Sequence, residues 1–137
     1  MAHWIGTHTP LGKGKVYTSF PAQTDYAEYI SGTIYSDQEG KLEIQQAFLP
    51  VYASEGGENF EEDIKKWAEE GNWALAPGAI PPVEGTEEAS KITVKAGERI
   101  AFKCFAVAPY WRLVYTNGGV DQKEFALEAR AFERGRI

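Results

Sequence analysis

The side chains best suited to nucleophilic or metal chemistry are few in this sequence. His3 and His8 are the two histidines, and Cys104 is the single cysteine. The two histidines lie in a spacing that matches neither one turn of a helix nor a zinc finger. Cys104 has no second cysteine with which to form a disulfide or a thiolate site, and it lies in the apolar stretch RIAFKCFAV. We predict surface histidines, a buried structural cysteine, and no metal ion or other cofactor.

Carboxylates are plentiful, but they occur in runs: EGGENFEED, WAEEG and EGTEE. Two carboxylates placed about 5–10 Å apart across a cleft can hydrolyse a glycosidic bond. Runs at a helix start and in loops are instead typical of solvated charge. DQEG and EDIKK lack the spacing of an EF-hand, and GKGK lacks the remaining positions of a phosphate-binding loop. We predict no catalytic residue, and expect that the protein is not an enzyme.

Aromatic side chains are the remaining candidates for a functional surface, and they make up 13% of the chain. In a lectin-like module, tryptophan and tyrosine stack on sugar rings. In a structural subunit, the same residues anchor protein contacts, and in any fold some of them belong to the core. Trp4 is the best anchor candidate, because its Gly- and Pro-rich surroundings offer little to bury it. The predicted partner-binding residues are Trp4, Ile5, Leu11, Tyr17 and Trp73.

Length and charge limit the classes of partner. The 137 residues suit one ordinary domain. The net charge is −6 with scattered basic residues, which argues against binding nucleic acid. No apolar run approaches the roughly 20 residues that span a bilayer, and the N-terminus does not resemble a secretory signal. We expect a soluble protein, made in the cytoplasm, that binds neither nucleic acid nor membrane.

The first half of the chain mixes breakers with strand patterns. Glycine and proline interrupt residues 1–28, which we predict to be an N-terminal arm that is poorly ordered alone. The turn-forming SDQEG predicts a hairpin of strands 29–36 and 41–48. Asn59 and Glu62 form a capping-box pattern before an apolar face, so we predict a helix near 59–70. It lies in a long connection, 50–90.

The last third is rich in strand signals. Alternating apolar residues predict strands at 92–95 and 99–107, joined by a short turn, and at 110–116 and 122–132. The pair Asn117–Gly118 favours a type I′ hairpin turn. Short strands about ten residues apart with a single helix predict an all-β protein. We expect an antiparallel β-sandwich or jelly roll, with 29–137 as its domain.

Two segments resemble virion proteins of tailed bacteriophages. SGTIYSDQEGKLEIQQAF (Ser31–Phe48) and VAPYWRLVYTNGGVDQKEFALEARAF (Val107–Phe132) are similar, in order, to a first and a closing hairpin of small β-sandwich subunits of phage heads and tails. The resemblance covers about a third of the chain. The connection 50–90 is longer than the one that this pattern has, and none of the matched positions is a catalytic residue.

The resemblance implies a structural role. It suggests a capsid decoration (cement) subunit that binds the major capsid protein on the surface of the virion and stabilises the expanded head. By the same analogy, we expect a homo-oligomer, and prefer a homotrimer. The alternative is a carbohydrate-binding or receptor-binding module of a phage tail, which would need exposed aromatics in line on one face. A small hydrolase is disfavoured because the strand-rich body contains no histidine, whereas a chaperone or assembly factor is compatible with the composition.

Overall fold

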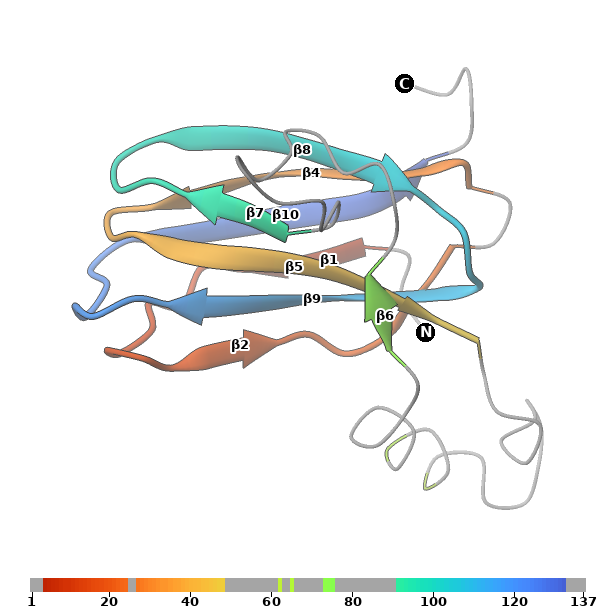
Figure 1. Ribbon diagram of the computed structural model, residues 1–137, viewed down its shortest axis with the longest axis horizontal. Coiled ribbons are helices and arrows are strands. Elements are labelled where there is room, and N and C mark those ends of the chain that lie inside the picture. The colour runs from red at the N-terminus through yellow and green to blue at the C-terminus, as the bar shows by residue number, and fades with distance from the viewer. Residues whose placement is uncertain are drawn as a thin grey trace.

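The computed structural model describes residues 4–24, 27–48, 62, 65, 73–75 and 91–132. Within these ranges, two antiparallel sheets pack face to face, so the chain is a β-sandwich, as predicted (Figure 1). Sheet A contains, in spatial order, β1 (Trp4–Thr7), β10 (Phe125–Phe132), β4 (Tyr29–Ser36) and β8 (Arg99–Phe105). Sheet B contains β2 (Val16–Thr18), β9 (Tyr110–Asn117), β5 (Gly40–Ala47) and β6 (Ala74–Leu75), with β3 (Ala22–Gln23) also on β9 and β7 (Lys91–Val94) also on β5.

Alternating side chains account for the two-layered arrangement. In β10, Leu127 and Ala129 are buried while Glu128 and Arg130 are exposed. Because successive side chains of a strand point to opposite faces, one face of each sheet enters the core and the other faces outward. The fully buried core residues are drawn from both sheets: Ile30, Ile34 and Leu127 from sheet A, and Leu42, Ile44, Ile92, Val94, Trp111, Leu113 and Tyr115 from sheet B.

Two glycines mark places where other atoms leave no room for a side chain. Gly32 lies opposite Ala129, and a Cβ added there would collide with the Glu128 carbonyl oxygen and lie 2.7 Å from the Ala129 Cα. A Cβ on Gly40 would overlap the Tyr115 hydroxyl group. Any side chain at Gly32 or Gly40 would therefore push these neighbouring groups apart.

The strands were predicted close to their observed bounds, but their expected pairing into hairpins is wrong. β4 belongs to sheet A and β5 to sheet B, β7 to sheet B and β8 to sheet A, and β9 to sheet B and β10 to sheet A. Each of these three connections therefore crosses from one sheet to the other (Figure 1). A turn signal marks where the chain reverses, but it does not say whether the two strands then share hydrogen bonds or face each other across the core.

The predicted type I′ turn at Asn117–Gly118 is also wrong. Asn117 is the last residue of β9, and it is buried. Its Nδ2 donates to the carbonyl oxygens of Leu11, Gly12 and Val120 at 3.2, 3.0 and 2.9 Å, respectively. Among the described residues, the glycines with positive φ are Gly14 and Gly97, and not Gly118. The asparagine side chain serves to tie the start of the chain to the crossing between the sheets.

The predicted N-terminal arm is part of the sandwich. β1 pairs with β10 from Trp4↔Arg130 to Thr7↔Leu127, and β2 and β3 both pair with β9. Without β1, the outer edge of β10 would present unpaired backbone groups, which explains why this short strand is retained there. Pro10, Gly12, Gly14 and Pro21, which suggested a loose arm, lie between the strands, whereas Gly6 lies within β1.

The predicted helix near 59–70 lies outside the described residues, apart from Glu62 and Lys65, which are exposed. That part of the expected domain division stays a prediction. In the described portion of the chain, no helix has the length and apolar character needed to cross a bilayer.

Candidate functional site: a groove on the outer face of sheet A

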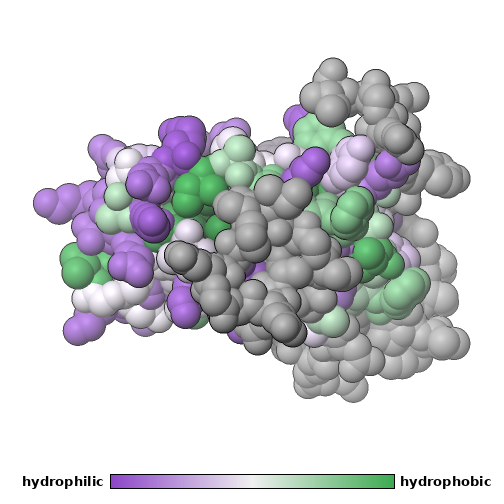
Figure 2. All heavy atoms as spheres, turned by 45° about the horizontal axis from the view of Figure 1, so that its top comes forward, coloured by the Kyte–Doolittle hydropathy of each residue, from purple (hydrophilic) through white to green (hydrophobic). Residues whose placement is uncertain are grey.

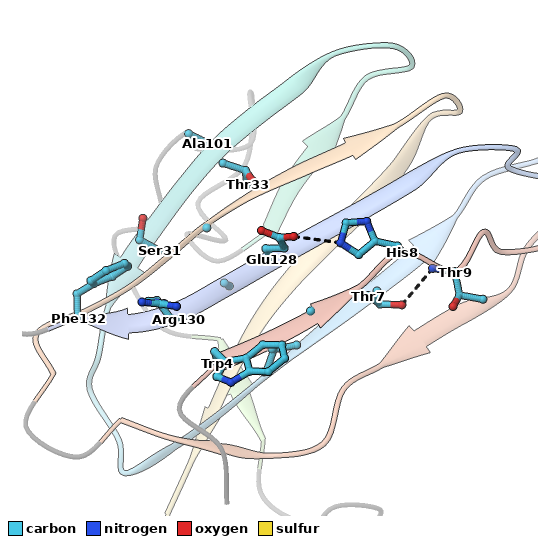
Figure 3. Close-up of a pocket in the computed structure, with 14 residues that line it drawn as sticks. Trp4, Thr7, His8, Thr9, Ser31, Thr33, Ala101, Glu128, Arg130 and Phe132 are labelled. Atoms are coloured by element: carbon cyan, nitrogen blue, oxygen red, sulfur yellow. Dashed lines mark hydrogen bonds and ion pairs between the residues drawn. The ribbon is translucent and has the colours of Figure 1, made fainter. Parts of the chain in front are cut away.

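A broad surface depression lies on the outer face of sheet A. It has a volume of about 1020 Å³ and opens broadly to solvent. Figure 3 shows that its polar and aromatic side chains come from β1, from His8 and Thr9 just after it, and from β10 and β4, with Ala101 contributed by β8. The outward-facing residues that define this groove are Trp4, Gly6, His8, Ser31, Thr33, Ala101, Glu128, Arg130 and Phe132.

Strand register builds the floor of the groove in two rows across the sheet. One row is Trp4, Arg130 and Ser31, which lie opposite one another on β1, β10 and β4. The next row is Gly6, Glu128 and Thr33, followed by Ala101 on β8. Gly6 has no side chain, and Ser31, Thr33 and Ala101 have small ones. The large side chains in these two rows are those of Trp4, Arg130 and Glu128.

Trp4 lies along its own strand, over Gly6. A Cβ added to Gly6 would come within 3.3 Å of the indole Cζ3 and 3.7 Å of Cε3, closer than ordinary contact for the first of these. Trp4 remains 61% exposed. Because Gly6 has no side chain, the indole of Trp4 can lie over its backbone, and most of the indole surface remains exposed in the groove.

An exposed hydrogen bond between His8 and Glu128 lies in the same groove. His8 Nε2 and Glu128 Oε1 are 3.0 Å apart, and both side chains are well exposed (Figure 3). Because both side chains are exposed, such a contact contributes little stability in water. The Arg130 guanidinium carbon lies 6.0 Å from the centre of the Phe132 ring, at the outer limit of a cation–aromatic contact.

Two further cations on the outer face of sheet A lie over tyrosine rings. The Arg99 guanidinium is 5.5 Å from the centre of the Tyr35 ring, and Lys103 Nζ is 5.3 Å from that of Tyr29. Arg99 and Lys103 can thus each form a cation–aromatic contact with a tyrosine of the neighbouring strand β4.

The five predicted partner-binding residues do not form one surface. Trp4 belongs to the groove, whereas Ile5, its neighbour in β1, is 6% exposed and lies in the core. Leu11 and Tyr17 pack partly buried against the same core, and burial raises the pKa of the Tyr17 hydroxyl. Trp73 packs against Ala47 and Tyr110, with the Arg112 guanidinium 4.3 Å from the centre of its ring. Ile5 is therefore corrected from a contact residue to a core residue.

The polar members of the groove were missed by sequence reasoning. Glu128 and Arg130 alternate with buried residues in β10, and Ser31 and Thr33 do the same in β4, which marks them only as solvent-facing. Their meeting depends on the register between β10 and β4, which are far apart in sequence. No local pattern carries that information.

The nucleophile and metal candidates of the sequence do not gather at the groove. Cys104 is 2% exposed, and burial raises the pKa of its thiol to about 12, so the thiolate nucleophile is disfavoured. His3 lies outside the described residues. In the described part of the chain, no three histidine, cysteine, aspartate or glutamate side chains are grouped to hold a metal ion.

Comparison with known proteins identifies the fold but not a family. No family model and no curated protein sequence matches this chain. Among solved structures, the PBSX exported protein XepA aligns with 97% of this chain at a TM-score of 0.63 and 18% identity, and this chain spans 38% of the length of that one. PirA aligns with 96% of this chain at a TM-score of 0.48 and 12% identity, covering 94% of PirA. A protein of the disulfide-linked pili of Bacillus endospore appendages aligns with 97% at 0.43 and 12% identity, covering 91% of that chain. The similarity to XepA shows a shared sandwich fold.

Proposed function

We propose that this chain is a structural protein of a tailed-phage particle, and more specifically a capsid decoration subunit that binds the major capsid protein of the expanded head. The observation that carries the proposal is where the two phage-like segments lie. Ser31–Phe48 contains most of β4 and all of β5, and Val107–Phe132 contains β9 and β10. These four strands are the central strands of the two sheets, so the resemblance covers the framework of the fold.

The order of the strands supports the same proposal. The spatial order of the strands in sheet A is β1-β10-β4-β8. In sheet B, β9 pairs with β2 and β3 on one side and with β5 on the other, and β5 also pairs with β6 and β7. The chain passes back and forth between the sheets, and this supports our proposal of a jelly roll, an architecture common in viral capsid domains. The fold shared with XepA, whose name describes an exported protein, suits a role in a particle or other extracellular assembly.

The chemistry of the groove supports a role in binding rather than catalysis. Its ionisable groups, His8, Glu128 and Arg130, are exposed to solvent, which gives them no desolvated setting in which to act as acid, base or nucleophile. Cys104, the one thiol, is buried on the inner side of sheet A. We therefore keep the expectation that the protein is not an enzyme.

An apolar end of the sandwich offers a surface for the attachment. Phe48, Phe105 and Val107 are each more than half exposed, and they lie where β5 and β8 end and β9 begins. Figure 2 shows apolar surface residues at this end of the molecule, on the right. Large exposed apolar side chains are typical anchors of protein contacts. We propose that this apolar end (Phe48, Phe105, Val107) contacts the capsid lattice, and that the subunits form homotrimers, which multiply weak contacts.

Co-sedimentation tests this function. The purified protein is mixed with unexpanded and expanded capsids of the phage that encodes it, and binding to expanded capsids alone is expected. A variant with Phe48, Phe105 and Val107 all changed to serine should lose that binding while its circular dichroism spectrum is kept. Lysine substitution of Val120, an exposed apolar residue on a different connection, is the matched control. Equal binding to both capsid forms, or none to either, would count against the decoration role.

A further inference from the structure

We propose that the groove on the outer face of sheet A binds a saccharide chain, with Trp4 as its stacking surface. This inference goes beyond the structural role and does not rest on it. A decoration subunit would expose one face to the surroundings of the particle, where such a site could act. The argument for the saccharide site itself depends only on the side chains of the groove.

The aromatic surface is the first step. The C–H face of a pyranose ring is apolar and packs against the face of an indole, where the aromatic electron density attracts the weakly positive hydrogens. Trp4 is 61% exposed, and its indole lies over Gly6. A stacking surface that is already in place loses little conformational freedom on binding.

The polar groups beside Trp4 match the hydroxyls of a sugar. Arg130 donates, the Glu128 carboxylate accepts, and the hydroxyls of Ser31 and Thr33 do both. Arg130 and Ser31 share a row with Trp4, while Glu128 and Thr33 form the next row. His8 contacts Oε1 of Glu128 and leaves Oε2 to accept from a ligand. A sugar stacked on Trp4 thus meets donors and acceptors on the adjacent floor.

The shape and charge of the groove favour a saccharide over other ligands. Its volume of about 1020 Å³ and its broad opening suit a chain of several rings better than one enclosed small molecule. A nucleic acid needs a track of cations along its phosphates. The groove itself carries one arginine, Arg130, and one glutamate, Glu128, and Lys103 continues the row of Arg130 and Ser31. These are too few cations for such a track. The floor beside Trp4 presents the hydroxyls of Ser31 and Thr33, which suit the hydroxyls of a sugar better than the apolar anchors of a protein partner.

A glycan array tests the proposal with the full chain. The array carries bacterial, plant and animal oligosaccharides and polysaccharides, and the strongest binder is then titrated against the intrinsic tryptophan fluorescence. Wild-type protein should bind a group of related glycans. Trp4→Ala should weaken that binding by roughly tenfold or more, because it removes the stacking surface. Gly6→Val should also weaken it, since the added side chain displaces the indole while Trp4 itself is retained. Phe20→Ala removes an exposed aromatic outside the groove and is expected to bind like the wild type.

Two results would overturn the saccharide site. One is a blank array with the wild-type protein. The other is glycan binding that Trp4→Ala and Gly6→Val leave unchanged. Binding of fluorescent oligothymidylate at the groove, lost in Trp4→Ala, would assign the surface to single-stranded nucleic acid instead. The capsid role is tested apart from all of these, because Trp4→Ala should still co-sediment with expanded capsids.

Discussion

At the scale of single residues, neighbours in one strand have opposite roles. Trp4 faces the groove and Ile5 faces the core, although both are apolar residues of the same short strand. Ile5→Ala should lower the free energy of unfolding by about 2–4 kcal/mol, since it removes a buried side chain and leaves a cavity. Trp4→Ala should change it by less than about 1 kcal/mol. Urea denaturation of the two variants measures both values, and equal losses would mean that Trp4 is a core residue.

A second residue-scale prediction concerns alkaline pH. Burial raises the pKa of the Cys104 thiol from 9.0 to about 12, and burial also raises the pKa of the Tyr115 hydroxyl. Above pH 9, the unfolded thiol loses its proton while the folded one keeps it, so the unfolded state binds fewer protons. The free energy of unfolding should therefore keep the full contribution of the buried thiol below pH 9. It should fall as pH rises from 9 towards about 12, by at most about 1.4 kcal/mol per pH unit for the thiol.

Cys104→Ala separates the thiol from the tyrosines. The variant keeps Tyr17 and Tyr115, whose raised pKa values act in the same direction. Its free energy of unfolding, measured by urea denaturation from neutral pH upward, should fall less steeply with pH than that of the wild type. Identical pH slopes would show that the thiol is not buried as a protonated group. Labelling with a thiol reagent gives a second measurement, since Cys104 should react only when the protein opens.

At the scale of elements, a buried glutamine side chain helps to hold the crossing from β8 to β9, together with Thr24, whose Oγ1 donates to the Ala108 carbonyl oxygen at 2.9 Å. Gln46 is buried in β5; its Nε2 donates to the Phe105 carbonyl oxygen at 2.7 Å, and its Oε1 accepts from the amides of Val107 and Ala108 at 2.8 and 3.2 Å. Gln46→Leu has a similar volume but leaves these backbone groups without their partner.

The cost of Gln46→Leu should be on the order of 3 kcal/mol, because each buried polar group left unsatisfied costs about 1–3 kcal/mol. Hydrogen exchange should show the amide of Val107 exchanging much faster, with amides in the middle of β4 changed only as global stability falls. Lys41→Ala, an exposed position on the same strand, provides the comparison and should be close to neutral. Unchanged exchange at Val107 would argue that water satisfies these groups equally well.

Sequence predicted the elements better than their partners. The alternation in β5, β8, β9 and β10 was readable because it reflects a local rule, one face in and one face out. Pairing depends on which strands meet across the core, and a turn such as SDQEG looks the same whether it joins hydrogen-bonded neighbours or opposite sheets. For the same reason, Trp4 was predicted to be a surface residue, while the meeting of Glu128 with His8 was not foreseen.

At the scale of the whole molecule, the path of the chain makes the two sheets interdependent. From β4 to β10 the chain alternates between the sheets: β4 is in sheet A, β5 to β7 are in sheet B, β8 is in sheet A, β9 is in sheet B and β10 is in sheet A. Neither sheet is formed by one continuous segment. The buried residues of both sheets also form one principal hydrophobic cluster, so opening one sheet would expose the core of the other.

This interdependence predicts that the β-sandwich unfolds in one cooperative transition. In urea, the far-ultraviolet circular dichroism signal, the fluorescence of the fully buried Trp111 in sheet B and the reactivity of Cys104 in sheet A should change with one midpoint. Native-state hydrogen exchange should likewise give the central amides of β4 and β9 the same free energy of opening, since both would exchange through global unfolding. A fluorescence transition that precedes Cys104 exposure, or central amides of β9 that open at a lower free energy than those of β4, would show that sheet B can open alone. The crossings between the sheets would then act as flexible joints, and the single core would not be what holds the layers together.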